Sequence, residues 1–354
     1  MLKVAKFGGS SLADSQCFLR AAKLVRDDPA RRVVVVSAAG KRRPGDAKIT
    51  DLLYLCNTHL ACGVSCWDLF RRIRERYMEI RDGCGLSVGL DEEFETVYNS
   101  LSVSPDLAAS RGEYLSARLM AALLDYEFCD AALWLRFDHD GQVDHAASRK
   151  ALRELAGDRP VVLPGFYGTG TDGQIRVFSR GGSDVTGALA AAFLDADLYE
   201  NWTDVPGVLS ADPRMTGLAH PVPSLRYEQL QFLTAAGLQV LHPDAVEPVA
   251  RQSIPLRICS TGQPELPGTL ISSEGVSEGL ATAGRKGLRI NGVPGTVALG
   301  AAVFPEGWWP RLRRSLDRVD HVVVSQTEES VRFLTGSNDL TAAVELLHQA
   351  ADDI

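Results

Sequence analysis

The chain has 354 residues, of which 45% are hydrophobic, and this is enough for one large domain and a smaller one. Its formal net charge of -8 gives no basic surface for nucleic acid, and no apolar run is long enough to span a bilayer. Seven cysteines form no CxxC pair and no zinc-ligand spacing. An odd number of scattered cysteines is typical of reduced thiols, so we expect a cytoplasmic protein with no nucleic-acid or membrane partner.

Apolar segments with strand character and with helix character alternate along the chain. Strands are predicted at 4–7, 33–37, 133–137, 160–164, 175–178, 198–202 and 256–258. Helices are predicted at 13–26, 51–80, 91–125, 188–194, 226–236 and 244–252. This alternation predicts an α/β fold in which helices cover both faces of a doubly wound, mainly parallel sheet.

The last part of the chain has a different organisation. Residues 272–279 are rich in glycine, serine and glutamate, which is typical of a linker. Residues 286–350 then show a short strand–helix–strand–strand–helix order, with 322–324 and 331–334 as its central hairpin. A separate, small α+β module is therefore predicted after the linker.

The first strand carries Lys6 and runs directly into Gly8, Gly9 and Ser10 before a helix. A turn without side chains at the N-terminus of a helix lets backbone N–H groups approach a phosphate, and a nearby lysine adds positive charge. The spacing is not that of a Walker A loop. A tight turn with a surface lysine explains this segment equally well, so this segment alone does not distinguish a phosphate site from a simple turn.

A second glycine pair, 181–182, precedes the alanine-rich helix, with Arg180 before it and Ser183 and Asp184 after it. Ser183 or Asp184 would serve as an N-cap in the simplest interpretation. A cap needs neither the glycine pair nor the arginine, however. A guanidinium beside exposed N–H groups is typical of a carboxylate or phosphate site, and an aspartate there can hold an ammonium group or orient a lysine.

Polar residues also follow the strand 198–202. Thr203 and Asp204 come directly after it, and a Val-Pro-Gly turn then leads to Asp212 and Arg214. Loops at the carboxyl ends of parallel strands are where α/β sheets bind nucleotides. Turn chemistry explains the prolines and the glycine, but it does not explain the polar pairs.

The order of these motifs resembles that of the aspartate kinases in the amino acid kinase family. The segments that carry the resemblance are 6–11, 37–41, 48–51, 111–113, 165–166, 179–184, 202–214, 240–243 and 268–270. The resemblance implies an amino-acid-kinase-type three-layer sandwich at 1–272, a linker at 273–284 and one ACT-like domain at 285–354. Aspartate kinases usually carry paired ACT domains, and the remaining stretch is long enough for one.

The resemblance also implies an activity and the residues for it. The activity is Mg²⁺-dependent and ATP-dependent phosphorylation of the L-aspartate side chain to 4-phospho-L-aspartate, by a homodimer, in the biosynthesis of lysine and threonine. Residues carried over for catalysis are Lys6, Arg180 and Asp184. Residues carried over for aspartate are Thr50, Glu113, Arg180 and Ser183. Residues carried over for ATP are Lys6, Gly8, Gly9, Ser10, Thr203, Asp204, Leu209, Asp212 and Arg214. No residue is carried over as a metal ligand.

One position departs from the family pattern. Aspartate kinases often have a lysine two residues before the Leu-His pair, and this chain has Gln239 there. An amide donates hydrogen bonds but supplies no positive charge. Two alternatives therefore stay open: a kinase that acts on another small amino or carboxylic acid, and a catalytically weak sensor of an amino acid or nucleotide.

Overall fold

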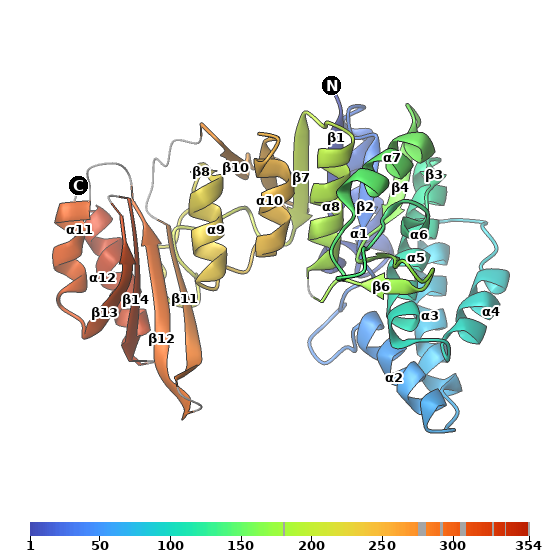
Figure 1. Ribbon diagram of the computed structural model, residues 1–354, viewed down its shortest axis with the longest axis horizontal. Coiled ribbons are helices and arrows are strands. Elements are labelled where there is room, and N and C mark those ends of the chain that lie inside the picture. Colours follow the sequence, from blue (N-terminus) through green and yellow to red (C-terminus); the bar gives the residue numbers. More distant parts are fainter. Residues whose placement is uncertain are drawn as a thin grey trace. The chain divides into compact units, whose positions relative to one another are not determined.

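The computed structural model describes residues 1–179, 181–274, 281–290, 293–304, 309–327, 329–336 and 338–352 (Figure 1). The chain divides into two compact units, Met1–Asp204 and Val205–Ile354. Arg180, which the resemblance assigns to catalysis and to aspartate binding, lies outside the described residues.

Five parallel strands form the centre of the first unit, in the order β3-β4-β2-β1-β7. Their bounds are β1 (Lys3–Phe7), β2 (Val33–Val36), β3 (Glu127–Phe128), β4 (Val161–Pro164) and β7 (Leu198–Thr203). Every residue of β2 and β4 is buried, as expected for strands that are covered on both faces. Lys6 of β1 is in register with Val35 on one side and with Asn201 on the other.

Two groups of helices cover this sheet, which confirms the predicted three-layer α/β sandwich (Figure 1). The first group is α1 (Ser15–Arg26), α2 (Ile49–Ala61), α3 (Trp67–Gly83), α4 (Asp91–Ser100) and α5 (Pro105–Leu124). The second group is α6 (Ala131–Trp134), α7 (His145–Ala156) and α8 (Gly182–Phe193). Helix α5 packs against β2 and β4, and α8 packs against β1, β2 and β7. The 3₁₀ helix η1 (Gly9–Leu12) and the antiparallel hairpin of β5 (Tyr167–Thr169) and β6 (Ile175–Val177) complete the unit.

Each of the two long helices predicted in this unit is a pair of helices. The predicted helix at 91–125 is interrupted because a new N-terminus is built inside it: Ser104 Oγ accepts a hydrogen bond from Leu107 N over 3.1 Å, and Pro105 occupies the first helical position. The predicted helix at 51–80 is interrupted at Gly63, whose φ of +71° belongs to the left-handed region. Apolar spacing continues across both breaks, so periodicity alone missed them.

The predicted strand at 133–137 is wrong. Residues Ala131–Trp134 form the helical turn α6, because the Asp130 side chain caps it by accepting a hydrogen bond from Ala132 N over 3.0 Å. The residues that follow, Arg136 and Phe137, form only isolated bridges. A short apolar run does not distinguish a strand from a buried helical turn.

The second unit contains a small sheet in the order β9-β10-β8, in which β10 is antiparallel to β9 and parallel to β8. Its strands are β8 (Ser224–Arg226), β9 (Leu256–Ser260) and β10 (Thr269–Ser272), and its helices are α9 (Tyr227–Ala235), η2 (Pro243–Ala245) and α10 (Val246–Ala250). The predicted helices near 226–236 and 244–252 and the predicted strand at 256–258 are confirmed. Among the described helices of the chain, none combines the length and the apolar character needed to span a bilayer.

A four-stranded antiparallel sheet, in the order β11-β12-β14-β13, ends the second unit. Its elements are β11 (Ala281–Ile290), β12 (Val293–Val303), α11 (Trp309–Leu316), β13 (His321–Gln326), β14 (Ser330–Gly336) and α12 (Leu340–Asp352). The predicted hairpin is confirmed by β13 and β14, but β13 lies at the edge of the sheet and not at its centre. The module has one strand more than predicted, because β11 precedes β12 and begins within the stretch 273–284. The predicted domain boundaries stay a prediction.

Candidate active site

Lys6 lies at the carboxyl end of the central strand β1, and polar residues from two neighbouring elements hold its ammonium group. Lys6 Nζ is 2.5 Å from Asp184 Oδ1 at the start of α8, and it donates to Asn201 Oδ1 of β7 over 3.4 Å. Asn201 Nδ2 donates to the same Asp184 oxygen over 3.1 Å. The Lys6 and Asp184 side chains are 7% and 17% exposed. A cation fixed in this way is ready to neutralise charge on an anion without first reorganising.

Asn201 is a site residue that the sequence interpretation missed. It contacts both predicted catalytic side chains, Lys6 and Asp184. The alternation of strands and helices predicts parallel strands, but it does not predict that β7 is the neighbour of β1. With that order known, the register places Asn201 directly beside Lys6.

The glycine turn after β1 packs closely against the loop that follows β2. Gly40 N donates to Gly9 O over 2.9 Å, and a Cβ added to Gly40 would stand 2.3 Å from Gly9 O. A Cβ added to Gly9 would stand 3.1 Å from Ala38 O. The two loops therefore approach each other at a distance that only glycine permits at position 40. Gly8 N donates to Trp202 O over 3.1 Å, so the turn is also fixed to β7, while Ser10 is exposed.

Glu113 is buried on α5, and its Oε2 has no hydrogen-bond partner among the described residues. Burial raises the pKa of Glu113 to about 8, although hydrogen bonds with the backbone of Ala38 and of Glu113 itself, and the charge of Arg111, lower it. A buried carboxyl group without a full set of partners is a favourable neighbour for a cationic ligand group.

The start of α2, which carries Thr50, meets α5 beside Glu113. A Cβ added to Gly112 would stand 2.8 Å from Ala38 Cβ and 3.2 Å from Ile49 Cγ2. Ile49 is the first residue of α2, and Thr50 follows it. Thr50 and Glu113 are therefore held next to the loop after β2, at the same edge of the sheet as Lys6.

Helix α8 brings Ser183 and Asp184 to this edge. Its N-cap is Gly181, whose φ of +59° lies in the left-handed region, so the chain turns sharply into the helix. A Cβ added to Gly165, directly after β4, would stand 2.7 Å from Ser183 Oγ. The predicted residues of the first unit, apart from Arg180, are thus gathered where β1, β2, β4 and β7 end. Thr203 and Asp204 complete the set at the end of β7, where Thr203 Oγ1 donates to Asp204 Oδ1 over 3.1 Å.

The remaining predicted nucleotide residues lie in the second unit, around a cavity of about 140 Å³. The lining residues are Val205, Gly207, Leu209, Ala211, Asp212, Pro213, Arg214, Gly237, Leu238, Gln239 and Val240. Arg214 Nη2 is 2.7 Å from Asp212 Oδ2, and the guanidinium lowers the pKa of that carboxyl. Gln239, which stands where many aspartate kinases have a lysine, lines the same cavity. Its mainly apolar lining and few polar groups suit a flat heterocycle.

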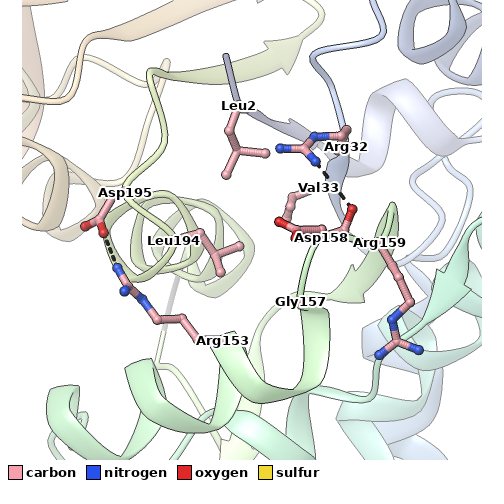
Figure 2. A pocket seen from close by; sticks show the side chains of 9 residues that line it. All are labelled: Leu2, Arg32, Val33, Arg153, Gly157, Asp158, Arg159, Leu194 and Asp195. Carbon is pink, nitrogen blue, oxygen red and sulfur yellow. Dashed lines mark hydrogen bonds and ion pairs between the residues drawn. The ribbon is translucent and has the colours of Figure 1, made fainter.

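A larger cavity, of about 330 Å³, lies at the opposite edge of the parallel sheet and contains no predicted site residue (Figure 2). Most of its lining residues lie at the amino ends of β1, β2, β4 and β7, and Arg153 belongs to α7. Its cationic side chains are already bonded: Arg153 pairs with Asp195, Arg159 pairs with Glu127, and Arg32 donates to a backbone carbonyl over 3.3 Å. Parallel sheets bind ligands at the carboxyl ends of their strands, so we place the active site at the other edge.

The chain is similar to known proteins over most of its length. Residues 1–260 match the model of the amino acid kinase family. Aspartokinase 3 of Bacillus subtilis is 35% identical over 291 residues, which cover 77% of this chain and 64% of the relative. Lysine-sensitive aspartokinase 3 of Escherichia coli is 30% identical over 300 residues, with 77% and 64% covered. The chain therefore spans less than two thirds of the length of these curated relatives.

Solved structures give the same result. The crystal structure of Clostridium acetobutylicum aspartate kinase superimposes with a TM-score of 0.87 at 31% identity and covers 99% of both chains. Escherichia coli aspartokinase III in complex with aspartate and ADP superimposes with a TM-score of 0.82 over 99% of both chains, and at 22% identity this likeness shows the fold. The chain belongs to the amino acid kinase family and, within it, to the aspartate kinases.

Proposed function

We propose that this protein transfers the γ-phosphoryl group of ATP to the side-chain carboxylate of L-aspartate, forming 4-phospho-L-aspartate and ADP. The observation that carries the proposal is the buried Lys6–Asp184 pair beside the glycine turn. Glu113 lies at the same edge of the sheet, where it suits the ammonium group of an amino acid. The complex of Escherichia coli aspartokinase III with aspartate and ADP supports the same pair of ligands.

The reaction places few demands on proton transfer. A carboxylate is ionised near neutral pH, so its oxygen attacks the γ-phosphorus without a general base. The bond from phosphorus to the bridging oxygen breaks, and ADP leaves with the electron pair. Lys6 neutralises charge on the transferred group, and Asp184 holds Lys6 in place. The backbone of Gly9 and Ser10 contacts the phosphates, while the Gly8 N–H group fixes the turn to β7.

Aspartate is proposed to bind through Thr50, Glu113, Arg180 and Ser183. Glu113 pairs with the substrate ammonium group, and Arg180 clamps a carboxylate in a bidentate manner. Because burial raises the pKa of Glu113 to about 8, an arriving ammonium group shifts this carboxyl toward its ionised form. Binding of aspartate near neutral pH therefore releases a proton from Glu113.

ATP is proposed to bind through Lys6, Gly8, Gly9 and Ser10 and through Thr203, Asp204, Leu209, Asp212 and Arg214. Mg²⁺, when bound, neutralises and orients the β- and γ-phosphate oxygens. The described residues contain no cluster of three or more metal-binding side chains. Mg²⁺ would enter with the ATP phosphates, and the Asp184 carboxylate beside Lys6 is the protein group that would contact it.

We also propose that the chain forms a cytoplasmic homodimer. Strand β13 is an edge of the four-stranded sheet, and Val322, Val323 and Val324 are 66%, 41% and 55% exposed. An open edge of β-branched residues suits pairing with another strand, and the same uncharged strand of a second copy meets no charge repulsion. Analytical ultracentrifugation is expected to show a dimer that Val323→Lys dissociates. All seven cysteines are unpaired thiols, which suits a reducing compartment.

An assay of ADP release with aspartate, ATP and Mg²⁺ tests the activity, with hydroxylamine to trap the acyl phosphate. We expect a hydroxamate that depends on aspartate. Turnover with a different small acid in a substrate panel would favour the alternative kinase. Nucleotide binding without turnover of any acid would favour the sensor.

A further inference from the structure

The 207–222 loop carries the predicted nucleotide residues of the second unit, and its two arms run antiparallel. Ser210 N donates to His220 O over 2.8 Å, and Val222 N donates to Val208 O over 2.8 Å. Leu209 and Pro221 form a bridge between these two hydrogen bonds. The tip of the loop, which includes Asp212, lines the 140 Å³ cavity. Contacts that hold the two arms in place therefore also position the part of the cavity wall that the loop forms.

Thr269, the first residue of β10, anchors the base of this loop. Its Oγ1 accepts a hydrogen bond from Val208 N over 2.8 Å and donates to Val222 O over 2.6 Å. Gly207 has a φ of +132°, and a Cβ there would stand 2.6 Å from Thr269 Oγ1. One buried side chain thus holds both arms to the sheet at one end.

His348 of α12 anchors the loop at its other end. Ser210 Oγ and His348 Nε2 are hydrogen bonded over 2.6 Å, and both residues are completely buried. The same Ser210 Oγ accepts from His220 N over 2.9 Å, and the His220 and His348 rings meet edge to face at 5.4 Å. The imidazole of α12 is therefore bonded to a hydroxyl that itself joins the two arms.

Apolar contacts place α12 directly behind the tip of the loop. Ala211 forms a buried cluster with Leu340 and Val344 of α12, and Met215 and Ala219 pack against its margin. Leu209 lines the cavity, and the next residue, Ser210, is hydrogen bonded to α12. Ala211 both lines the cavity and packs against α12. The contacts of the loop with α12 therefore involve residues within or directly beside the cavity lining.

We propose that His348 is a positioning residue for the nucleotide. Its hydrogen bond to Ser210 holds Leu209, Ala211 and Asp212 in the arrangement that binds ATP, so the last helix of the C-terminal module sets nucleotide affinity without touching the nucleotide. This inference rests on the proposed function, because it takes the 140 Å³ cavity as a nucleotide site. The apolar cluster would be enough to pack α12 against the loop. The buried hydroxyl–imidazole hydrogen bond is directional, so it also fixes the position of Ser210 relative to the helix.

The test compares full-length variants in binding of Mg²⁺-ADP by titration calorimetry and in steady-state kinetics. His348→Leu and Ser210→Ala each remove the hydrogen bond, and we expect each to raise the Kd for ADP and the KM for ATP about tenfold. The KM for aspartate, and kcat at saturating ATP, are expected to stay within about twofold. His348→Gln retains a side chain that can hydrogen bond, and it is expected to restore most of the affinity. The double variant is expected to be no worse than Ser210→Ala alone, because that change already removes the bond to His348 together with the bond from His220 N.

Leu347→Ala is the matched control. Leu347 is the neighbour of His348 on α12, but it is buried in the core of the C-terminal module with Phe304 and Phe333. It is expected to lower the Tm and to leave the Kd for ADP unchanged. The inference is overturned if His348→Leu and Ser210→Ala bind ADP as the wild type does, if their effects add, or if Leu347→Ala weakens ADP binding equally. A wild-type chain that binds no nucleotide overturns both this inference and the proposed function. If the wild type is active and the two variants bind ADP as it does, only the inference is overturned.

Discussion

Two aspartate–cation pairs occur among the predicted site residues, and they differ in burial. In the first unit, Lys6 and Asp184 are 2.5 Å apart, with side chains only 7% and 17% exposed. In the second unit, Arg214 and Asp212 are 2.7 Å apart, with side chains 81% and 26% exposed. Removing one member of a buried pair leaves an uncompensated charge and costs about 3–5 kcal/mol, whereas an exposed pair contributes little because water screens both charges.

The supporting elements differ in the same way. Lys6 lies on a central strand and Asp184 on a helix packed against that strand, so rigid elements fix the distance between them. Arg214 and Asp212 lie on a loop that is held through the side chains of Thr269 and His348. We infer that the groups for phosphoryl transfer are fixed by the sheet, while the groups for nucleotide affinity are adjustable through the anchors of the loop. The predictions below test this division.

The largest effect is expected for Lys6→Ala. Loss of the buried cation removes the charge that neutralises the transferred phosphoryl group, so kcat should fall about 1,000-fold or more. The same change leaves Asp184 without its ammonium partner, and the free energy of unfolding should fall by about 3 kcal/mol. Hydroxamate formation measures the first effect and denaturant unfolding measures the second.

Lys3→Ala is the matched control for that variant. Lys3 lies on the same strand and forms an ion pair with Asp28 at 2.6 Å, but at the amino end of β1. It should therefore lose some stability and retain kcat. Equal losses of kcat in both variants would show that the assay reports folding rather than the charge at Lys6.

The second effect is expected for Glu113→Gln, which should raise the KM for aspartate about 10- to 100-fold because the amide cannot pair with the substrate ammonium group. This variant also has a pH signature. The pKa of Glu113 is raised from 4.5 to about 8, so the folded protein binds a proton that the unfolded chain has lost. The stability of the wild type is therefore complete below about pH 4.5 and decreases as the pH rises to about 8.

Glu113→Gln should lack this decrease in stability, and urea unfolding at pH 5 and at pH 8 measures the free energy of unfolding at each pH. Each unit of pKa corresponds to about 1.4 kcal/mol, so the free energy of unfolding should fall clearly more in the wild type than in the variant between these two pH values. Glu92→Gln, at an exposed position on α4, is the control and should leave both the KM and the pH dependence unchanged. A variant that keeps the wild-type pH dependence would refute the assignment of the titration to Glu113.

A third, smaller effect concerns the cavity of the second unit. Gln239→Lys returns the cation that many aspartate kinases have at this position, and it should lower the KM for ATP about threefold to tenfold, with a steeper dependence on salt. Gln231→Lys adds the same charge at an exposed position on α9 and should change neither. If both variants improve the KM equally, the gain comes from net charge and not from the cavity.

Some site residues could be predicted from the sequence and others could not. The glycine turn at Gly8 and the motif at Asp184 have a fixed local chemistry, so their positions at helix N-termini beside the sheet were predictable. The roles of Asn201 and His348 depend on which strand lies beside β1 and on which loop α12 covers. These are contacts between residues distant in sequence, and no spacing in a single chain encodes them. The same limit explains the wrong strand at 133–137, where a local cap at Asp130 decided between two structures with the same apolar pattern.

The smallest effect is expected for Arg214→Ala. Because its guanidinium is exposed and pairs with Asp212 at the surface, the variant should keep its Tm within about 1 °C and its kcat unchanged. The KM for ATP should rise about twofold to fivefold, and the rise should shrink at high salt, where charges in water are screened. Asp212→Asn tests the partner, since an amide still hydrogen bonds with the guanidinium. It should give a smaller rise in the KM for ATP if the carboxylate serves mainly to orient Arg214. A loss of kcat in Arg214→Ala comparable with that of Lys6→Ala would break the division between a fixed transfer site and an adjustable nucleotide loop.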